Sequence, residues 1–97
     1  MAAYLIVDLT VTDPATMEEY RKRVPGTIAK YGGRYLVRGG AHQTLEGDWK
    51  PDRLVVLEFP SLEQARRWYD CEEYREPKAM RLRAGRAKIV MVEGVAP

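Results

Sequence analysis

The chain has 97 residues, the length of one domain, so we expect a single domain over residues 1–97. Its 16 basic and 14 acidic residues give a formal net charge of +2 and are interspersed along most of the sequence, which argues against a nucleic-acid-binding surface. No apolar run approaches the roughly 20 residues of a membrane span, and the single Cys71 permits no intramolecular disulfide. We therefore expect a cytoplasmic protein whose partners include neither nucleic acid nor membrane.

The first third of the chain predicts a strand and then a helix. Residues 3–11 alternate with a period of two, which is typical of a strand with one buried face. Asp13 can cap a helix over residues 14–30, whose apolar residues recur at spacings of three and four. Pro25 predicts a kink or short break in this helix, and Gly32 predicts its end. The apolar face of the strand is expected to carry Leu5, Val7, Leu9 and Val11.

The rest of the chain predicts two more helices and three more strands. Ser61 and Gln64 form a capping-box pattern, which marks a helix start, and Asp70 and Cys71 mark a break before the next helix. In chain order we predict a strand at 34–38 that could extend to His42, a polar loop at 43–52, a strand at 53–59, a helix from 62, a short helix at 72–83 and a strand at 86–93.

This order of elements, β-α-β-β-α-β, predicts the ferredoxin-like α+β plait. Right-handed crossovers give a four-stranded antiparallel sheet of order 4-1-3-2 with the helices on one face. The uncovered face is then too apolar to leave in water, and we expect a second copy to pack against it, sheet to sheet, in a homodimer. The residues predicted for this face are Tyr4, Ile6, Leu54, Val56, Ile89 and Met91.

Charged residues are also predicted on the uncovered face. Asp8 and Glu58 fall there on neighbouring strands, and Arg38 or Arg34 is the nearest candidate partner. Charges buried between two sheets must be paired or hydrogen-bonded. They therefore form either a structural ion network or part of a pocket, and the sequence leaves both alternatives open.

His42 lies just beyond the glycine pair Gly39-Gly40, at the rim of this expected pocket. Histidine is the natural general base near neutral pH, although an exposed position at the loop entry explains His42 more simply. The glycines would let a ligand or a backbone come close, or would simply form a bulge or turn. Our candidates are His42, Glu58 and Asp8 for catalysis, and Arg38, Arg34, Tyr4, Trp49, Gly39 and Gly40 for ligand binding. We expect no metal and no cofactor, because one histidine without clustered acids makes no convincing metal site.

A set of specific motifs covers nearly the whole chain: Tyr31-Gly-Gly-Arg-Tyr-Leu-Val-Arg-Gly-Gly40, Leu45-Glu-Gly47, Pro51-Asp-Arg53, Glu58-Phe-Pro-Ser61, Ala65, Trp68, Tyr74 and Val92-Glu-Gly94. In combination they resemble the bacterial domain-of-unknown-function 1330 family of the dimeric α+β barrel superfamily. The resemblance implies the same plait and sheet-to-sheet dimer. Relatives in that superfamily include cofactor-independent monooxygenases, muconolactone isomerases, haem-degrading enzymes and stress-responsive proteins, but the family itself implies no reaction.

Two functions remain open on the sequence alone. In the first, a pocket on the barrel side of the sheet binds a small organic molecule, anionic or aromatic, as in a cofactor-independent isomerase or monooxygenase. In the second, the protein is a non-catalytic binding or stress-response module whose buried charges are a structural ion network. Whether the protein is an enzyme is left undecided, because analogy within a superfamily is a weak warrant for function.

Overall fold

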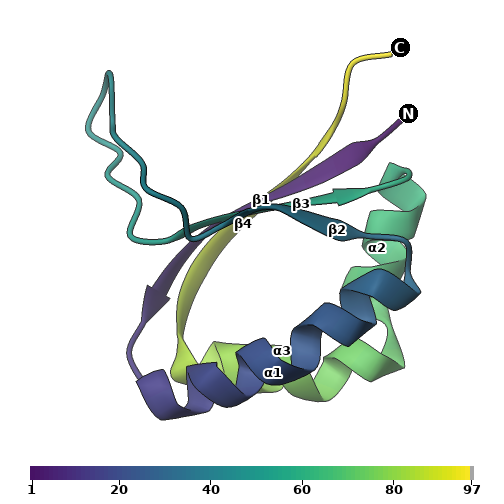
Figure 1. Cartoon of the computed structure of the whole chain (residues 1–97), viewed down its shortest axis with the longest axis horizontal. Helices are drawn as coiled ribbons and strands as arrows, with labels where there is room; N and C mark the ends of the chain where they lie inside the picture. The colour runs from purple at the N-terminus through teal and green to yellow at the C-terminus, as the bar shows by residue number, and fades with distance from the viewer. Residues whose placement is uncertain (97) are drawn as a thin grey trace.

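The computed structural model describes residues 1–96 and confirms the predicted order of elements (Figure 1). The predicted break at Cys71 separates the second and third helices. The elements are β1 (Ala3–Val11), α1 (Pro14–Lys30), β2 (Arg34–Arg38), β3 (Leu54–Phe59), α2 (Leu62–Asp70), α3 (Glu72–Ala84) and β4 (Gly85–Glu93).

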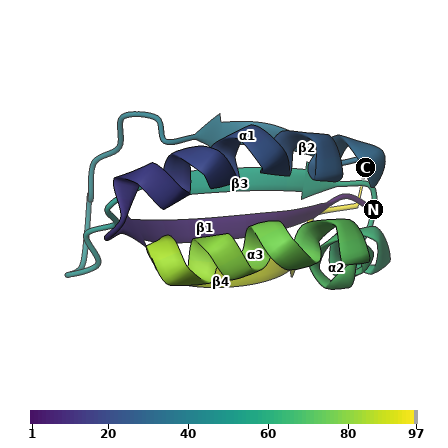
Figure 2. The same ribbon diagram turned by 90° about the horizontal axis from the view of Figure 1, so that it is seen from below.

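The four strands form one antiparallel sheet in the order β2-β3-β1-β4, which confirms the predicted order read from the other edge. All three helices lie on one side of the sheet, with α1 and α3 running alongside each other across it (Figure 2). The fold is therefore the ferredoxin-like α+β plait. Within residues 1–96, no helix is both long and apolar enough to cross a membrane.

Both predicted helix caps are present. The Asp13 side chain accepts a hydrogen bond from the amide of Thr16 at 3.2 Å, and the Ser61 hydroxyl accepts one from the amide of Gln64 at 3.1 Å. Each bond satisfies an amide that lacks a partner within its own helix. These two short sequence signals thus fix where α1 and α2 begin.

Helix α1 continues through Pro25, so the break that we considered there is absent. It ends at Lys30, and the predicted stop is Gly32, which has a φ of +80° that L side chains rarely adopt. The amide of Gly32 donates to the carbonyl of Ala29 at 3.0 Å, and that of Gly33 donates to Ile28 at 2.9 Å. This pair of bonds is a Schellman motif, which satisfies the last carbonyls and turns the chain into β2.

The hydrophobic core lies between the sheet and the helices. Its largest side chains are aromatic, and the rings of Trp68 and Tyr74 stack with centroids 4.1 Å apart. The Trp68 indole donates to the hydroxyl of Thr27 at 3.0 Å, so its polar atom is satisfied within the core. The main cluster consists of Ala3, Leu5, Val24, Ile28, Leu57, Phe59, Ala65, Trp68 and Tyr74.

One part of the predicted uncovered face is wrong. Strand β4 pairs with β1 so that Ile89 lies opposite Val7 and Met91 lies opposite Leu5. Residues directly opposite each other share a face, so Ile89 and Met91 lie on the helix side. Their neighbours Val90 and Val92 take the uncovered face instead and are 60% and 44% exposed. A register difference of one residue exchanges every side chain between the two faces, and the sequence of β4 alone does not set it.

Candidate functional site

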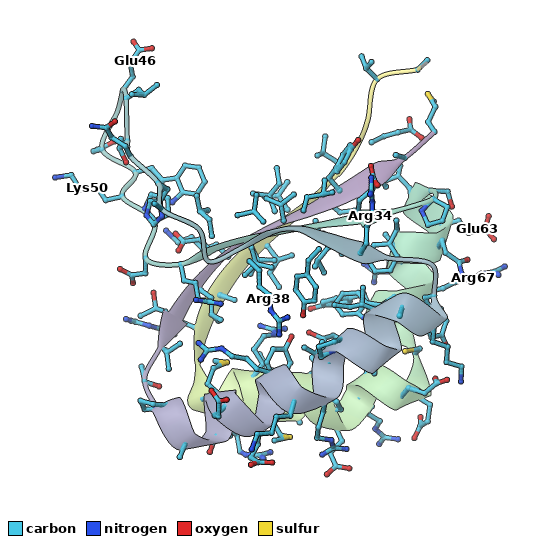
Figure 3. The ribbon with its side chains drawn as sticks, viewed as in Figure 1. Arg34, Arg38, Glu46, Lys50, Glu63 and Arg67 are labelled. Carbon is cyan, nitrogen blue, oxygen red and sulfur yellow. The ribbon has the colours of Figure 1, made fainter. Side chains whose placement is uncertain are left out.

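A β-bulge in β2 decides which face of the sheet its side chains occupy. Between Tyr35 and Val37 the register with β3 shifts, so Leu36 is an extra residue without a partner. The pairs are Arg34 with Glu58, Tyr35 with Leu57, Val37 with Val56, and Arg38 with Val55. Tyr35 and Arg38 therefore share the helix side. Figure 3 shows Arg38 on that side of the sheet and Arg34 on the uncovered side.

A cavity of about 60 Å³ lies between the sheet and the helices. Its walls are mostly apolar and come from β1, β3, α1 and the aromatic core. Four arginines, Arg21, Arg38, Arg53 and Arg81, also line it, but no Asp, Glu or His does among the described residues. Small-molecule sites commonly combine apolar walls with a few polar groups in this way.

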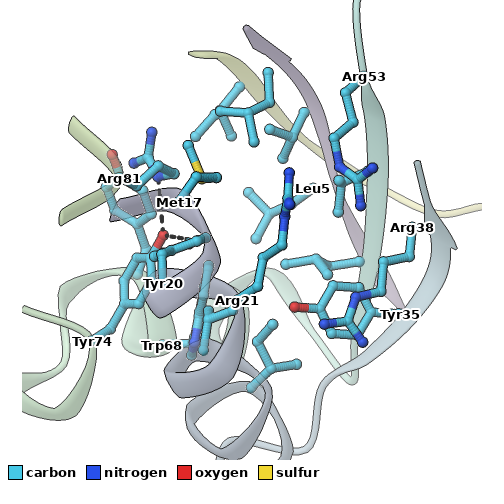
Figure 4. A pocket seen from close by; sticks show the side chains of 18 residues that line it. Leu5, Met17, Tyr20, Arg21, Tyr35, Arg38, Arg53, Trp68, Tyr74 and Arg81 are labelled. Carbon is cyan, nitrogen blue, oxygen red and sulfur yellow. Dashed lines mark hydrogen bonds between the residues drawn. The ribbon is translucent and has the colours of Figure 1, made fainter. Parts of the chain in front are cut away.

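Three of these arginines gather on one side of the cavity, and we call Arg21, Arg38 and Arg53 the arginine cluster (Figure 4). The guanidinium of Arg38 lies 4.5 Å from the centre of the Tyr35 ring, a cation–π contact that orients it. Arg21 has a long ion pair of 3.5 Å with the exposed Glu18. Among residues 1–96, Arg38 and Arg53 have no carboxylate within ion-pair distance.

Gly39 makes room for Arg53. It has a φ of +72°, and a side chain built on it would overlap the Arg53 guanidinium. The Gly39 amide also donates to the carbonyl of Leu54 at 2.7 Å, which holds the two ends of the long loop together. The group that lies close to Gly39 is therefore the Arg53 side chain of the same molecule. It brings a second guanidinium to the side of the cavity where Arg38 lies.

On the opposite side of the cavity, a hydrogen-bonded chain joins Tyr20, Tyr74 and Arg81 (Figure 4). The two phenolic oxygens are 2.9 Å apart, and Nε of Arg81 donates to the Tyr74 hydroxyl at 3.3 Å. Arg81 is only 5% exposed. Burial raises the pKa of Tyr20, so its hydroxyl stays protonated.

The predicted acids lie on the uncovered face of the sheet, and each has a structural partner. Nε of Arg34 donates to Glu58 at 2.6 Å, as a cross-strand pair between β2 and β3. Asp8 accepts from Nε1 of Trp49 at 2.9 Å and from the amide of Asp52 at 3.0 Å. The Trp49 bond is the main reason that the pKa of Asp8 lies below its ordinary value.

The other sequence candidates also lie away from the cavity. His42 is exposed, and its ring nitrogens lie 3.3 Å from the carbonyl of Gly40 and 2.8 Å from that of Pro51. Tyr4 lies opposite Glu58 and therefore on the uncovered face. Of the two arginines expected as partners of the predicted acids, Arg34 pairs with Glu58, whereas the expectation for Arg38 is wrong because the bulge at Leu36 turns it towards the helices. The catalytic roles considered for these residues stay predictions.

Sequence reasoning missed Tyr20, Arg21, Tyr35, Arg53 and Arg81 because it assigned the interior between sheet and helices to packing alone. Two signals were present. Arg53 stands two residues before Val55, so in the predicted strand at 53–59 both fall on the same face. Arg81 stands seven residues after Tyr74, which places both on one side of α3. Arginines at positions that share a face with buried apolar residues thus indicate this cavity.

The fold and the cavity together define a small α+β protein of the ferredoxin-like class. The chain belongs to the family described as a domain of unknown function (DUF1330), whose profile matches residues 2–95. Among curated proteins, none matches this chain.

Solved structures with low sequence identity share the fold. A protein of unknown function from Rhodopseudomonas palustris has a TM-score of 0.78 and 15% identity, over 99% of this chain and 84% of its own. A dimeric ferredoxin-like protein of unknown function from Jannaschia sp. has a TM-score of 0.70 and 14% identity, over 97% and 100%. SnoaB, a cofactor-independent oxygenase from Streptomyces nogalater, has a TM-score of 0.66 and 14% identity, over 99% and 95%.

Proposed function

We propose that the protein binds a small organic anion in the cavity between the sheet and the helices. The observation that carries this proposal is the arginine cluster, which faces an apolar cavity with no acidic residue in its lining among residues 1–96. Positive charges without a carboxylate nearby create a potential that favours an anion, and low-dielectric walls strengthen that potential. Guanidinium groups suit planar carboxylates in particular.

The apolar walls indicate an organic ligand and not a free inorganic anion. Leu5, Val7 and Leu57 line the cavity together with the ring of Trp68. An apolar ligand body gains free energy from contact with such walls, at about 25 cal/mol per Å² of apolar surface removed from water. The anionic group would then lie at the arginine cluster, with the apolar body beyond it.

The cavity supports binding more directly than it supports proton transfer. An isomerase that removes a proton near neutral pH needs a base such as His, Asp or Glu in contact with the substrate. None lines the cavity within the described chain, and Tyr20 is held in its protonated form. Binding without catalysis is therefore the primary proposal.

Cofactor-independent oxygenation is the second candidate. Guanidinium groups beside an apolar cavity would stabilise a substrate in its enolate or phenolate form. Such an anion can supply the electrons itself, so that a CH2 group and O2 give a carbonyl group and water. The similar structure from Streptomyces nogalater is described as a cofactor-independent oxygenase, which supports this candidate by analogy only.

We also propose that the protein is a homodimer that packs sheet to sheet. The uncovered face carries Tyr4, Ile6 and Val56 next to the exposed Val90 and Val92. Apolar surface of this extent normally marks an interface. The loop between β2 and β3 rises on the same side of the sheet, away from the helices (Figure 1). Because the cavity lies on the helix side of the sheet, the dimer would leave it in place in each protomer.

A thermal-shift comparison of benzoate with benzamide tests the binding proposal. The two molecules have nearly the same shape, but only benzoate is charged. A ligand that binds only the folded state raises the melting temperature by roughly 10–20 °C at a hundredfold excess over Kd. We expect benzoate and related carboxylates to raise the melting temperature and their amides not to; equal effects of both would contradict an anion site.

A further inference from the structure

Tyr20 and Tyr74 bring two hydroxyl protons to the side of the cavity opposite Arg38 and Arg53 (Figure 4). Their oxygens make one mutual contact of 2.9 Å. Nε of Arg81 also contacts the Tyr74 oxygen, and because that nitrogen can only donate, Tyr74 is the acceptor. Among residues 1–96 neither hydroxyl has any further hydrogen-bond partner. The two hydroxyl groups carry two protons but form only one hydrogen bond with each other, so one of the protons is not used in that bond.

Arg81 decides which hydroxyl keeps the unused proton. It is 5% exposed and has no carboxylate within ion-pair distance in the described chain. A hydroxyl that accepts a hydrogen bond from a cation becomes a stronger donor, because the first bond polarises it. Either oxygen can be the donor in the bond between the tyrosines, and the arrangement that we infer has Tyr74 donating to Tyr20, which leaves the Tyr20 proton for another acceptor.

Tyr20 is placed to give this proton to a ligand. Tyr74 is 1% exposed and enclosed by the aromatic core, whereas Tyr20 is partly exposed and lines the cavity. Because burial raises the pKa of Tyr20, the hydroxyl acts as a donor and not as a base. A ligand oxygen at this position would accept the Tyr20 proton and gain a hydrogen bond inside the cavity.

We infer that the ligand is an oxo carboxylic acid, with its carboxylate held by Arg38 and Arg53 and its ketone oxygen accepting a hydrogen bond from Tyr20. The inference rests on the proposed function, since the anion must first bind at the arginine cluster. Leu5 and Leu57 line the cavity with these polar groups, so the carbon atoms between the two ends of the ligand must be apolar.

Isothermal titration calorimetry with a series of methyl-ketone carboxylic acids tests this inference. The series begins at levulinate and lengthens by one methylene at a time. Each member is compared with the unbranched carboxylate of the same carbon count that has no ketone group. At the length that spans the cavity, we expect the ketone acid to bind roughly two- to tenfold more tightly than its partner. In Tyr20→Phe this preference should vanish or reverse, because a carbonyl group in an apolar cavity without a donor is unfavourable.

Tyr4→Phe is the matched control, since it removes a tyrosine hydroxyl from the uncovered face and should keep the preference. An infrared measurement on the wild type needs no variant: the carbonyl band of an isotope-labelled ketone acid should shift to lower frequency on binding. No preference at any length, a preference that persists in Tyr20→Phe, or an unshifted band would each overturn the inference. If the unbranched carboxylates bind and lose affinity in Arg53→Gln, the proposed function stands even so. If no carboxylate binds, the proposed function itself fails.

Discussion

Arg34 and Arg38 lie on opposite faces of the same sheet, although both belong to β2 and are four residues apart. A regular strand would place them on one face, because its side chains alternate with a period of two. The extra residue Leu36 changes the parity, so Arg34 pairs with Glu58 on the uncovered side and Arg38 reaches the cavity. One bulge thus separates a structural arginine from a candidate ligand-binding one.

Gly39→Ala should weaken anion binding and lower stability. The new methyl group would displace the Arg53 guanidinium, and the φ of +72° would be strained by roughly 1–3 kcal/mol. Gly47→Ala is a matched control, because Gly47 has a φ of +86° but nothing near a side chain built on it. Chemical denaturation should show a similar loss of stability in both variants, whereas calorimetry should show lost affinity only in Gly39→Ala. Equal affinity in the two would contradict a role for Arg53.

Val90→Glu should dissociate the proposed homodimer. Val90 is 60% exposed on the uncovered face, and a carboxylate buried between two sheets would lack a partner. Leu82→Glu is the control, because Leu82 is 64% exposed but belongs to α3 on the other side of the molecule. Size-exclusion chromatography with light scattering should give twice the chain mass of 11.1 kDa for wild type and Leu82→Glu, and the single-chain mass for Val90→Glu. A monomeric wild type at micromolar concentration would exclude the dimer.

Glu58→Gln should leave ligand binding unchanged and cost at most about 1 kcal/mol of stability. Its ion pair with Arg34 is partly exposed and lies on the face away from the cavity. His42→Ala should likewise leave affinity unchanged, because the ring nitrogens of His42 lie against the loop carbonyls of Gly40 and Pro51, away from the cavity. Urea denaturation and calorimetry measure the two effects. A large loss of binding in either variant would indicate that the ligand site lies on the uncovered face of the sheet.

Acid should weaken the contact between α1 and α3. The hydrogen bond from Lys30 is the main reason that the pKa of Glu73 is lowered from 4.5 to about 2. A carboxyl with a depressed pKa in the folded state stabilises the fold above its unfolded pKa, and this contribution is lost as the pH falls from about 4.5 to about 2. Melting temperatures followed over this range should fall less steeply in Glu73→Gln than in the wild type. Parallel curves for the two proteins would show that the pair contributes nothing to stability.

The sequence predicts the fold well because its signals are local. The alternation of residues 3–11, the cap at Asp13 and the stop at Gly32 each involve only a few neighbouring residues, and together they leave few topologies. The site depends on contacts between residues that are far apart in the sequence. Nothing within Arg34–Arg38 reveals the bulge, which exists only through the pairing of β2 with β3. The interior cavity could have been partly predicted from Arg53, whose spacing from Val55 places it on the buried face.

Calorimetric titration of one carboxylate into two arginine variants of β2 tests the central claim most directly. The probe is the carboxylate that gives the largest thermal shift in the wild type, and the variants are Arg38→Gln and Arg34→Gln. Hydrogen bonds to charged groups contribute about 1.5–3 kcal/mol, so Arg38→Gln should weaken binding by roughly tenfold or more. Arg34→Gln should bind as the wild type does, because its side chain lies on the other face of the sheet. Equal affinities in the two variants, or a larger loss in Arg34→Gln, would contradict an anion site between the sheet and the helices.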